Sequence, residues 1–156
     1  MSKPIKKIEP TLFDMPFASM SYLLITDRRQ LKRIKGVIGE KLLEATPKKK
    51  DIEGFRAIAV ATTVESYGRY GVIYYPQLLT DDVDLVMQVL CHECVHLWQG
   101  FHKDVICEDQ PSDEFEAYTV DQIFGNTIEE YRKLLKAQDK LSGAACGDKK
   151  VCTASS

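Results

Sequence analysis

The chain has 156 residues, of which 44% are hydrophobic and 28% charged, the balance of an ordinary soluble globular protein. This length fits a single domain with a buried core, and we expect residues 1–142 to form it, followed by a flexible tail over 143–156. The formal net charge of −2 gives no electrostatic reason to expect nucleic acid or a membrane surface as a partner.

The start of the chain and its cysteines predict the compartment. The first ten residues, MSKPIKKIEP, lack the apolar segment of a secretory signal, and the apolar run over 17–25 is too short to cross a bilayer. The five cysteines are an odd number and cannot all pair within one chain. We therefore expect reduced thiols and a cytoplasmic protein.

Residue patterns predict the elements in chain order. Residues 1–26 have no clear period, and apolar residues at a 3.6-residue spacing then predict a helix over about 29–45. The β-branched and apolar segments 55–64 and 70–76 predict two strands, which can pair as a hairpin. An acidic first turn and an apolar interior predict a helix over about 81–99.

Two shorter helices are predicted after this one. Ser112 is expected to cap the first of them, which should end at Gly125. Thr127 and Glu130 fit the capping box of a last helix, which should reach about residue 140. The order of elements predicts an α+β protein with a C-terminal helical part.

The segment VLCHECVHLWQGFH carries an H-E-x-x-H motif at 92–96, within the predicted helix. At about 100° per residue, His92 and His96 lie about 40° apart, so both imidazoles can bind one metal ion. Glu93 lies about 100° from His92, where it can reach a water on the metal without being a ligand. The spacing therefore suits two zinc ligands and a general base. The alternative is a pair of core histidines that hydrogen bonds satisfy.

A Cys-x-x-Cys pair, Cys91 and Cys94, runs through the same segment. Helix geometry places both thiols roughly opposite the histidines, so the two pairs cannot share one ion. We expect both cysteines to be small buried residues of a helix that is apolar nearly all round. A redox role is less favoured, because Cys91 falls in mid-helix and not at an exposed N-terminus.

A catalytic zinc with an open position needs a third protein ligand, and two residues are candidates. His102 has the spacing of H-E-x-x-H-x-x-G-x-x-H, but Gln99 occupies the glycine position and the glycine comes one residue later, at Gly100. Glu116 lies in SDEFEAYTVDQ, on the next predicted helix, after a loop long enough to reverse the chain.

HECVHLWQ followed by EFEAYTVDQ resembles the minimal gluzincin-type zincins of bacterial and bacteriophage genomes. Their pattern is H-E-x-x-H-x-x-Q followed by E-A-Y or a close variant, and the resemblance covers residues 71–124. It implies a zincin-like fold with the active-site helix beside a small mixed or antiparallel sheet. It also implies one Zn²⁺ bound by His92, His96 and Glu116, with Glu93 as the base. From its spacing alone, His102 stays the alternative candidate ligand.

The resemblance also implies a function. In such folds a strand beside the active-site helix binds the substrate as an added strand, and Val72, Ile73 and Tyr74 are the expected counterpart. We expect a zinc-dependent peptidase that acts on a peptide or protein, binds neither nucleic acid nor membrane, and works in the cytoplasm of a bacterial or phage-infected cell. SprT-type proteases share HExxHLWQ-like text, but they usually carry a further histidine downstream, and none follows His102.

Two questions stay open at this stage. The first is whether the protein is instead a zincin-fold zinc-binding protein without peptidase activity, which would serve as a binding or host-interaction module. The second is which residue stabilises the developing oxyanion. Its candidates are phenols, namely Tyr67, Tyr70, Tyr74, Tyr75 and Tyr118. The sequence does not give the oligomeric state.

Overall fold

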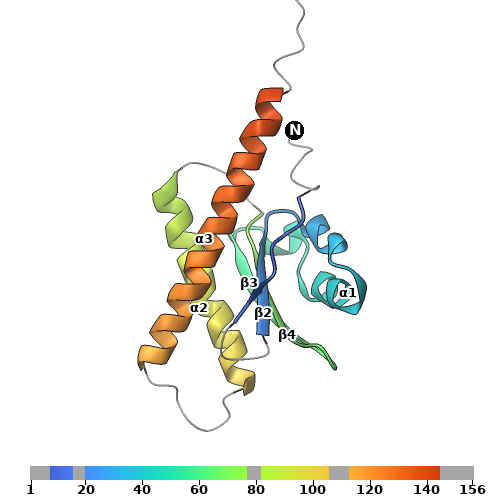
Figure 1. Cartoon of the computed structure of the whole chain (residues 1–156), viewed down its shortest axis with the longest axis vertical. Coiled ribbons are helices and arrows are strands. Elements are labelled where there is room, and N and C mark those ends of the chain that lie inside the picture. Colours follow the sequence, from blue (N-terminus) through green and yellow to red (C-terminus); the bar gives the residue numbers. More distant parts are fainter. Residues whose placement is uncertain (1–7, 16–19, 77–81, 106–112, 145–156) are drawn as a thin grey trace, which may run out of the picture.

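The computed structural model describes residues 8–15, 20–76, 82–105 and 113–144. It contains a four-stranded mixed sheet in the order β1-β2-β4-β3, with β2 and β4 parallel and the other pairs antiparallel. Two long helices, α2 and α3, lie on one side of the sheet, and α1 lies on the other (Figure 1). The expected α+β class, with a sheet and a C-terminal helical part, is confirmed.

The strands β1 (Phe13–Asp14) and β2 (Met20–Ile25) lie in the segment for which the sequence predicted no element. Tyr22 and Leu24 of β2 pack toward α2 and α3, whereas Leu23 and Ile25 pack toward α1. Both faces of this strand are therefore covered. A strand buried on both faces has no polar–apolar alternation, which is why the period-2 signal is missing there.

The predicted hairpin is confirmed as β3 (Ile58–Val64) and β4 (Gly68–Tyr74), which pair antiparallel. Ser66 and Gly68 have φ angles of 65° and 103° at the turn, and this left-handed backbone lets the chain reverse within three residues. The strand β4 is central and pairs with β2 on its other side, so β3 forms the outer edge of the sheet.

The predicted helix over 29–45 is divided in two. A 3₁₀ helix, η2 (Arg28–Arg33), precedes α1 (Gly36–Ala45), and a further 3₁₀ helix, η3 (Lys49–Ile52), follows. Gly36 has a φ of 72°, a left-handed conformation that interrupts the helical path between η2 and α1. The apolar spacing identified the buried face but not this break, because a single backbone angle leaves the pattern unchanged.

Two predicted helix ends were wrong. The helix α2 (Val83–Val105) begins after Asp82, whose side chain accepts a hydrogen bond from the Leu85 N–H, and it continues through Gly100. The helix α3 (Asp113–Ala144) is continuous through Gly125, and the predicted cap at Ser112 lies outside the described residues. Packing against the rest of the domain keeps a helix intact across one glycine, whose intrinsic cost is only about 1 kcal/mol.

The expected capping box at Thr127 is an interior turn of α3. The Thr127 hydroxyl donates to the Ile123 carbonyl oxygen at 2.7 Å, so it bonds backward along an unbroken helix. Glu130 is buried and accepts hydrogen bonds from Thr11 and Lys133. Of the expected tail, residues 143–144 belong to α3, and 145–156 lie outside the described residues.

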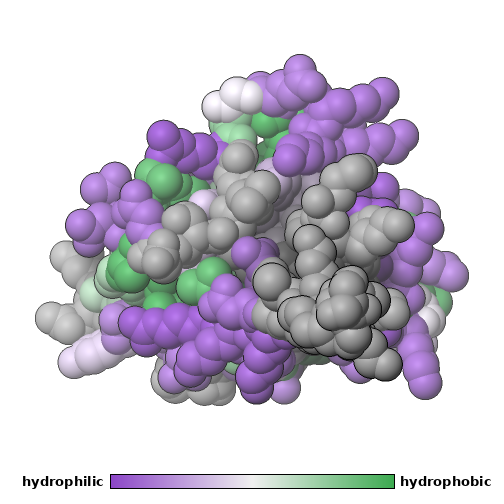
Figure 2. Space-filling view, turned by 90° about the horizontal axis from the view of Figure 1, so that it is seen from above, coloured by the Kyte–Doolittle hydropathy of each residue, from purple (hydrophilic) through white to green (hydrophobic). Residues whose placement is uncertain are grey.

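The surface seen from above is largely hydrophilic, with hydrophobic side chains in separate small areas (Figure 2). None of the helices in the described ranges combines the length and the apolar character that crossing a membrane requires.

Gly71 sets how closely α2 approaches the sheet. A Cβ atom at this position of β4 would lie 2.4 Å from Leu97 Cδ1 and 2.7 Å from Phe101 Cζ. We expect Gly71→Ala to lower the free energy of unfolding by about 1–3 kcal/mol, because both apolar side chains must move within a packed core. Urea unfolding followed by circular dichroism measures this change.

Gly125→Ala is the matched control for Gly71→Ala. Gly125 is exposed in mid-helix, and beyond the adjacent helix backbone a Cβ there would have no neighbour within 4 Å, so this change should stabilise the protein by about 0.5–1 kcal/mol. An unchanged unfolding midpoint for Gly71→Ala would contradict the close approach of α2 to β4.

Candidate active site

His92 and His96 lie on an exposed face of α2, and their side chains converge. The two Nε2 atoms are 3.0 Å apart, and the rings are perpendicular at 89° with centroids 4.5 Å apart. Two nitrogens bound to one tetrahedral zinc at about 2.0–2.1 Å each would lie about 3.3 Å apart. The observed separation is thus close to what one shared ion requires, and the donor set fits zinc.

Glu93 is next to this pair but buried, with only 7% of its surface exposed. Its carboxylate accepts a hydrogen bond from the backbone N–H of Ala59, on the outer strand β3. Burial raises the pKa of Glu93, while the Ala59 hydrogen bond and the nearby His92 and His96 act in the opposite direction. A carboxylate that is held in place with a raised pKa suits a general base.

The β3 strand presents a backbone edge beside the histidines. In an antiparallel pair, alternate residues direct their N–H and C=O groups toward the partner strand, and the others direct them away. Because the Ala59 N–H bonds to Glu93, the same alternation directs the backbone groups of Ala61 and Thr63 away from β4. A Cβ on Gly100 would lie 3.1 Å from Ala61 Cβ, so α2 runs close to this edge.

The expected substrate strand, β4, has no open edge. Val72, Ile73 and Tyr74 are buried residues of β4, which pairs with β2 on one side and with β3 on the other. The backbone groups of β4 already pair with the strands on both sides, so a peptide cannot pair with β4. Within the described strands, the open edge near the motif belongs to β3.

An open hollow of about 340 Å³ adjoins the motif. His92 and Glu93 line it together with Gln88 and Val89 of α2 and with residues 54–57, which lead into β3. Arg56 is exposed and is among the lining residues, a position that the sequence did not predict. Arg56 lies two residues before the edge strand β3, and this position is the only feature of the sequence that could have suggested its place at the hollow.

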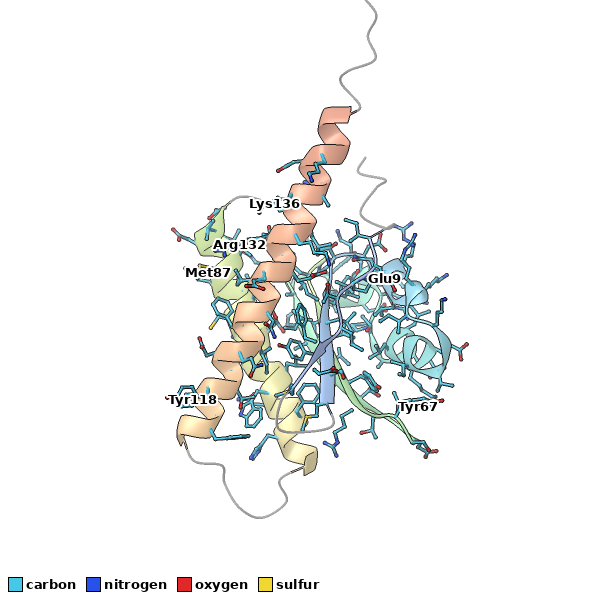
Figure 3. All side chains as sticks on the ribbon, in the orientation of Figure 1. Glu9, Tyr67, Met87, Tyr118, Arg132 and Lys136 are labelled. Carbon is cyan, nitrogen blue, oxygen red and sulfur yellow. The ribbon has the colours of Figure 1, made fainter. Side chains whose placement is uncertain are left out.

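The five tyrosines that were candidates for oxyanion stabilisation lie elsewhere. Tyr70 donates its hydroxyl to the Tyr67 carbonyl oxygen at 3.1 Å, Tyr75 packs edge-on against Tyr131, and Tyr74 is buried on the α1 side of the sheet. Tyr67 and Tyr118 are 57% and 71% exposed. In Figure 3 these two lie at the outer ends of the molecule, on the hairpin and on α3. None of the five lines the hollow at His92.

His102 is not placed as a third ligand. Because α2 continues through Gly100, His102 lies about 240° around the helix from His96, and not in a loop as expected. Its ring centroid is 5.5 Å from that of Trp98, and its Nε2 is buried without a hydrogen-bond partner among the described residues. The glycine that would turn the chain toward the metal comes one residue late and does not break the helix.

Glu116 is exposed near the start of α3. This helix packs on the Cys94 face of α2, where Cys94 Sγ lies 3.8 Å from Thr127 Oγ1, and that face is opposite the histidines. Within the described ranges, no group of three His, Cys, Asp or Glu side chains is arranged to hold a metal. The structure thus brings together His92, His96 and Glu93 but does not bring Glu116 to them.

The two cysteines of the motif differ from each other. Cys94 is buried as expected, and burial raises the pKa of its thiol to about 12. Cys91 is exposed, as are Val83 and Met87, so the expectation of a helix buried all round was wrong. The outer face of α2 is open to solvent because α3 and the sheet cover only two of its sides.

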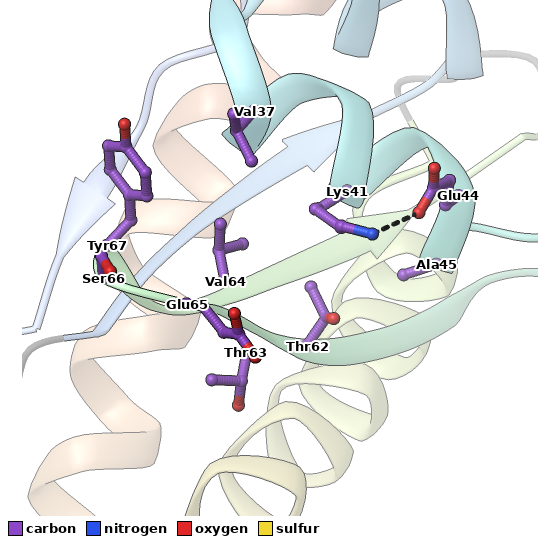
Figure 4. A pocket seen from close by; sticks show the side chains of 10 residues that line it. All are labelled: Val37, Lys41, Glu44, Ala45, Thr62, Thr63, Val64, Glu65, Ser66 and Tyr67. Carbon is purple, nitrogen blue, oxygen red and sulfur yellow. Dashed lines mark hydrogen bonds and ion pairs between the residues drawn. The ribbon is translucent and has the colours of Figure 1, made fainter.

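A larger hollow, of about 960 Å³, lies between α1 and the hairpin (Figure 4). Lys41 and Glu44 form an ion pair of 3.0 Å on its α1 side, and Thr62, Val64 and Tyr67 line the hairpin side. No histidine or cysteine lines it, so it does not contribute to the chemistry of the motif.

No family model, curated protein or solved structure matches this chain. The interpretation of the site therefore depends on its own geometry: two converging imidazoles, a buried carboxylate and an adjacent strand edge.

Proposed function

We propose that this protein is a zinc-dependent peptidase in which His92 and His96 hold one Zn²⁺ and Glu93 is the general base. The observation that carries the proposal is the 3.0 Å approach of the two Nε2 atoms on an exposed helix face, beside a buried carboxylate. A bound zinc would supply Lewis-acid chemistry, since it lowers the pKa of a water bound to it toward neutrality.

The protein's own groups would then move the proton and position the substrate. Glu93 accepts a proton from the attacking water and passes it to the leaving amine. The Ala59 N–H keeps this carboxylate in place. Among the described residues that line the same hollow, Arg56 is the cation that would stabilise negative charge on the scissile carbonyl oxygen.

The substrate would be an extended peptide that pairs with the outer edge of β3. Ala61 and Thr63 offer outward backbone groups for such a pairing, and main-chain hydrogen bonds of this kind bind peptides with little regard to side chains. The substrate would still bind as an added strand, but beside β3 and not beside β4.

One observation favours the alternative, a zinc-binding protein without peptidase activity. Among the described residues only two protein ligands converge, whereas a catalytic zinc usually has three. Glu116 stays the predicted third ligand, and it can serve only if the start of α3 moves to the histidine face of α2.

Zinc content and cleavage, measured together, test the proposal. The purified protein is given Zn²⁺, its metal content is determined by native mass spectrometry, and new termini in a mixture of unfolded proteins are mapped by peptide sequencing. We expect one zinc per chain and new termini. Zinc without cleavage would favour the alternative, and no zinc uptake would contradict both. Glu116→Gln in the same assay tests the third ligand, because zinc binding should weaken if Glu116 is a ligand and stay unchanged if it remains on the opposite side of α2.

A further inference from the structure

Gln99 is not part of the H-E-x-x-H motif, yet its side chain contacts a residue of the motif. Its amide oxygen Oε1 lies 3.2 Å from Nδ1 of His96, one turn back on the same helix. A carbonyl oxygen only accepts hydrogen bonds, so this contact is a hydrogen bond when the proton is on His96 Nδ1. The other ring nitrogen, Nε2, then carries a free lone pair, and this is the atom that faces His92.

We propose that Gln99 is a positioning residue that holds His96 in the Nδ1–H tautomer with Nε2 directed at the metal position. The identity of the metal rests on the proposed function, but the tautomer does not. A hydrogen bond to the second nitrogen of a metal-binding histidine fixes the tautomer and the ring orientation. Position 99 is where a glycine would turn the chain toward a third histidine. Here it carries a group that supports the second histidine.

The same geometry assigns the opposite tautomer to His92 in the metal-free protein. Since His96 Nε2 is an acceptor, the 3.0 Å contact is a hydrogen bond only if His92 donates from its own Nε2–H. A metal ligand must present a lone pair at that nitrogen. Metal binding therefore requires the His92 proton to leave Nε2, whereas His96 needs no change.

Long-range ¹H–¹⁵N spectra of the histidine rings test this in the wild-type protein, at a pH where both rings are neutral. In metal-free protein we expect His96 as the Nδ1–H tautomer and His92 as the Nε2–H tautomer. On addition of zinc, His92 should change to Nδ1–H and His96 should keep its tautomer. A proton on Nε2 of His96 in the metal-free protein would overturn the proposal.

Variants at position 99 provide the second measurement, zinc affinity by competition with a chromophoric chelator. Gln99→Leu keeps the size and removes the acceptor, so zinc should bind about 10–100-fold more weakly, the usual cost of losing such a partner. Gln99→Glu restores an acceptor and should bind zinc at least as tightly as Gln99 does. Gln122→Leu is the matched control, because Gln122 is an exposed glutamine on α3, away from the histidines.

These outcomes separate this proposal from the proposed function. Wild-type affinity in Gln99→Leu, or equal loss in Gln122→Leu, would overturn the role of Gln99. Failure of the wild-type protein to bind zinc would contradict the proposed function, but the tautomer of His96 in the metal-free protein would still decide the role of Gln99.

Discussion

Glu93→Gln is expected to abolish peptide hydrolysis while leaving zinc binding intact. The amide has nearly the shape of the carboxylate, and its oxygen can still accept the hydrogen bond from the Ala59 N–H. It cannot take a proton from water. General bases contribute about 10²–10⁴-fold to rates, so kcat should fall by at least about 10²-fold. The measurement is kcat on a cleaved peptide, together with zinc affinity by chelator competition.

The same substitution should also make the protein more stable at neutral pH. Burial raises the pKa of Glu93 in the folded state, so the unfolded chain releases this proton at lower pH than the folded protein does. The free energy of unfolding therefore falls as pH rises between the two pKa values. Glutamine does not ionise, so Glu93→Gln avoids this loss of stability. Urea unfolding at two pH values measures the resulting gain in the free energy of unfolding. Such a gain is typical of residues kept for activity and not for stability.

Glu129→Gln is the matched control, since Glu129 is an exposed glutamate on α3. It should change neither kcat nor zinc affinity. If Glu93→Gln retains hydrolysis, another group must take the proton, and the assignment of the base is wrong. If Glu93→Gln loses zinc as well, Glu93 is a ligand and the helix geometry has been misinterpreted.

Local periodicity predicted the parts of the fold that depend on neighbouring residues. The hairpin of β3 and β4 follows from two β-branched runs around a short polar turn, and α2 follows from its apolar spacing. Strand β2 escaped prediction because both of its faces are buried. The helix ends at Gly100 and Gly125 were wrong because tertiary packing outweighs the small cost of one glycine.

The candidate site likewise has one part that follows from neighbouring residues and one part that depends on tertiary structure. His92, Glu93 and His96 are within one helical turn of one another, so helix geometry alone predicted their arrangement. Ala59 lies on β3 and Arg56 just before it, and their place beside α2 depends on a strand order that no local pattern contains. The sequence could not show that β4 lacks an open edge, because which strand is outermost depends on the pairing of β2.

The contact that Gln99 makes with His96 also joins two residues that are close in the sequence. It lies three residues after His96, a spacing that places two side chains together on a helix. From the sequence, Gln99 was the last residue of the H-E-x-x-H-x-x-Q pattern and occupied the glycine position of a longer zinc motif, but neither pattern gave it a contact. In the structure the helix continues, and the same residue supports the second histidine.

His92→Ala is expected to abolish zinc binding at concentrations where the wild-type protein is saturated. In the described part of the chain two imidazoles converge, and removal of one leaves a single nitrogen, which does not hold zinc in water. The loss should exceed the about 10–100-fold expected for Gln99→Leu, because a ligand contributes more than its hydrogen-bond partner. His92 is exposed, so stability should change by no more than about 0.5 kcal/mol.

His102→Ala is the control that makes the His92 result specific. It removes a histidine from the same helix, about 240° around from His96, where it packs beside Trp98. Zinc affinity should be unchanged. A loss in His102→Ala equal to that in His92→Ala would mean that α2 ends near Gly100 when metal binds and that His102 turns back as the third ligand. Retention in His102→Ala with loss in His92→Ala and His96→Ala would instead restrict the helical ligands to the pair that converges in the structure.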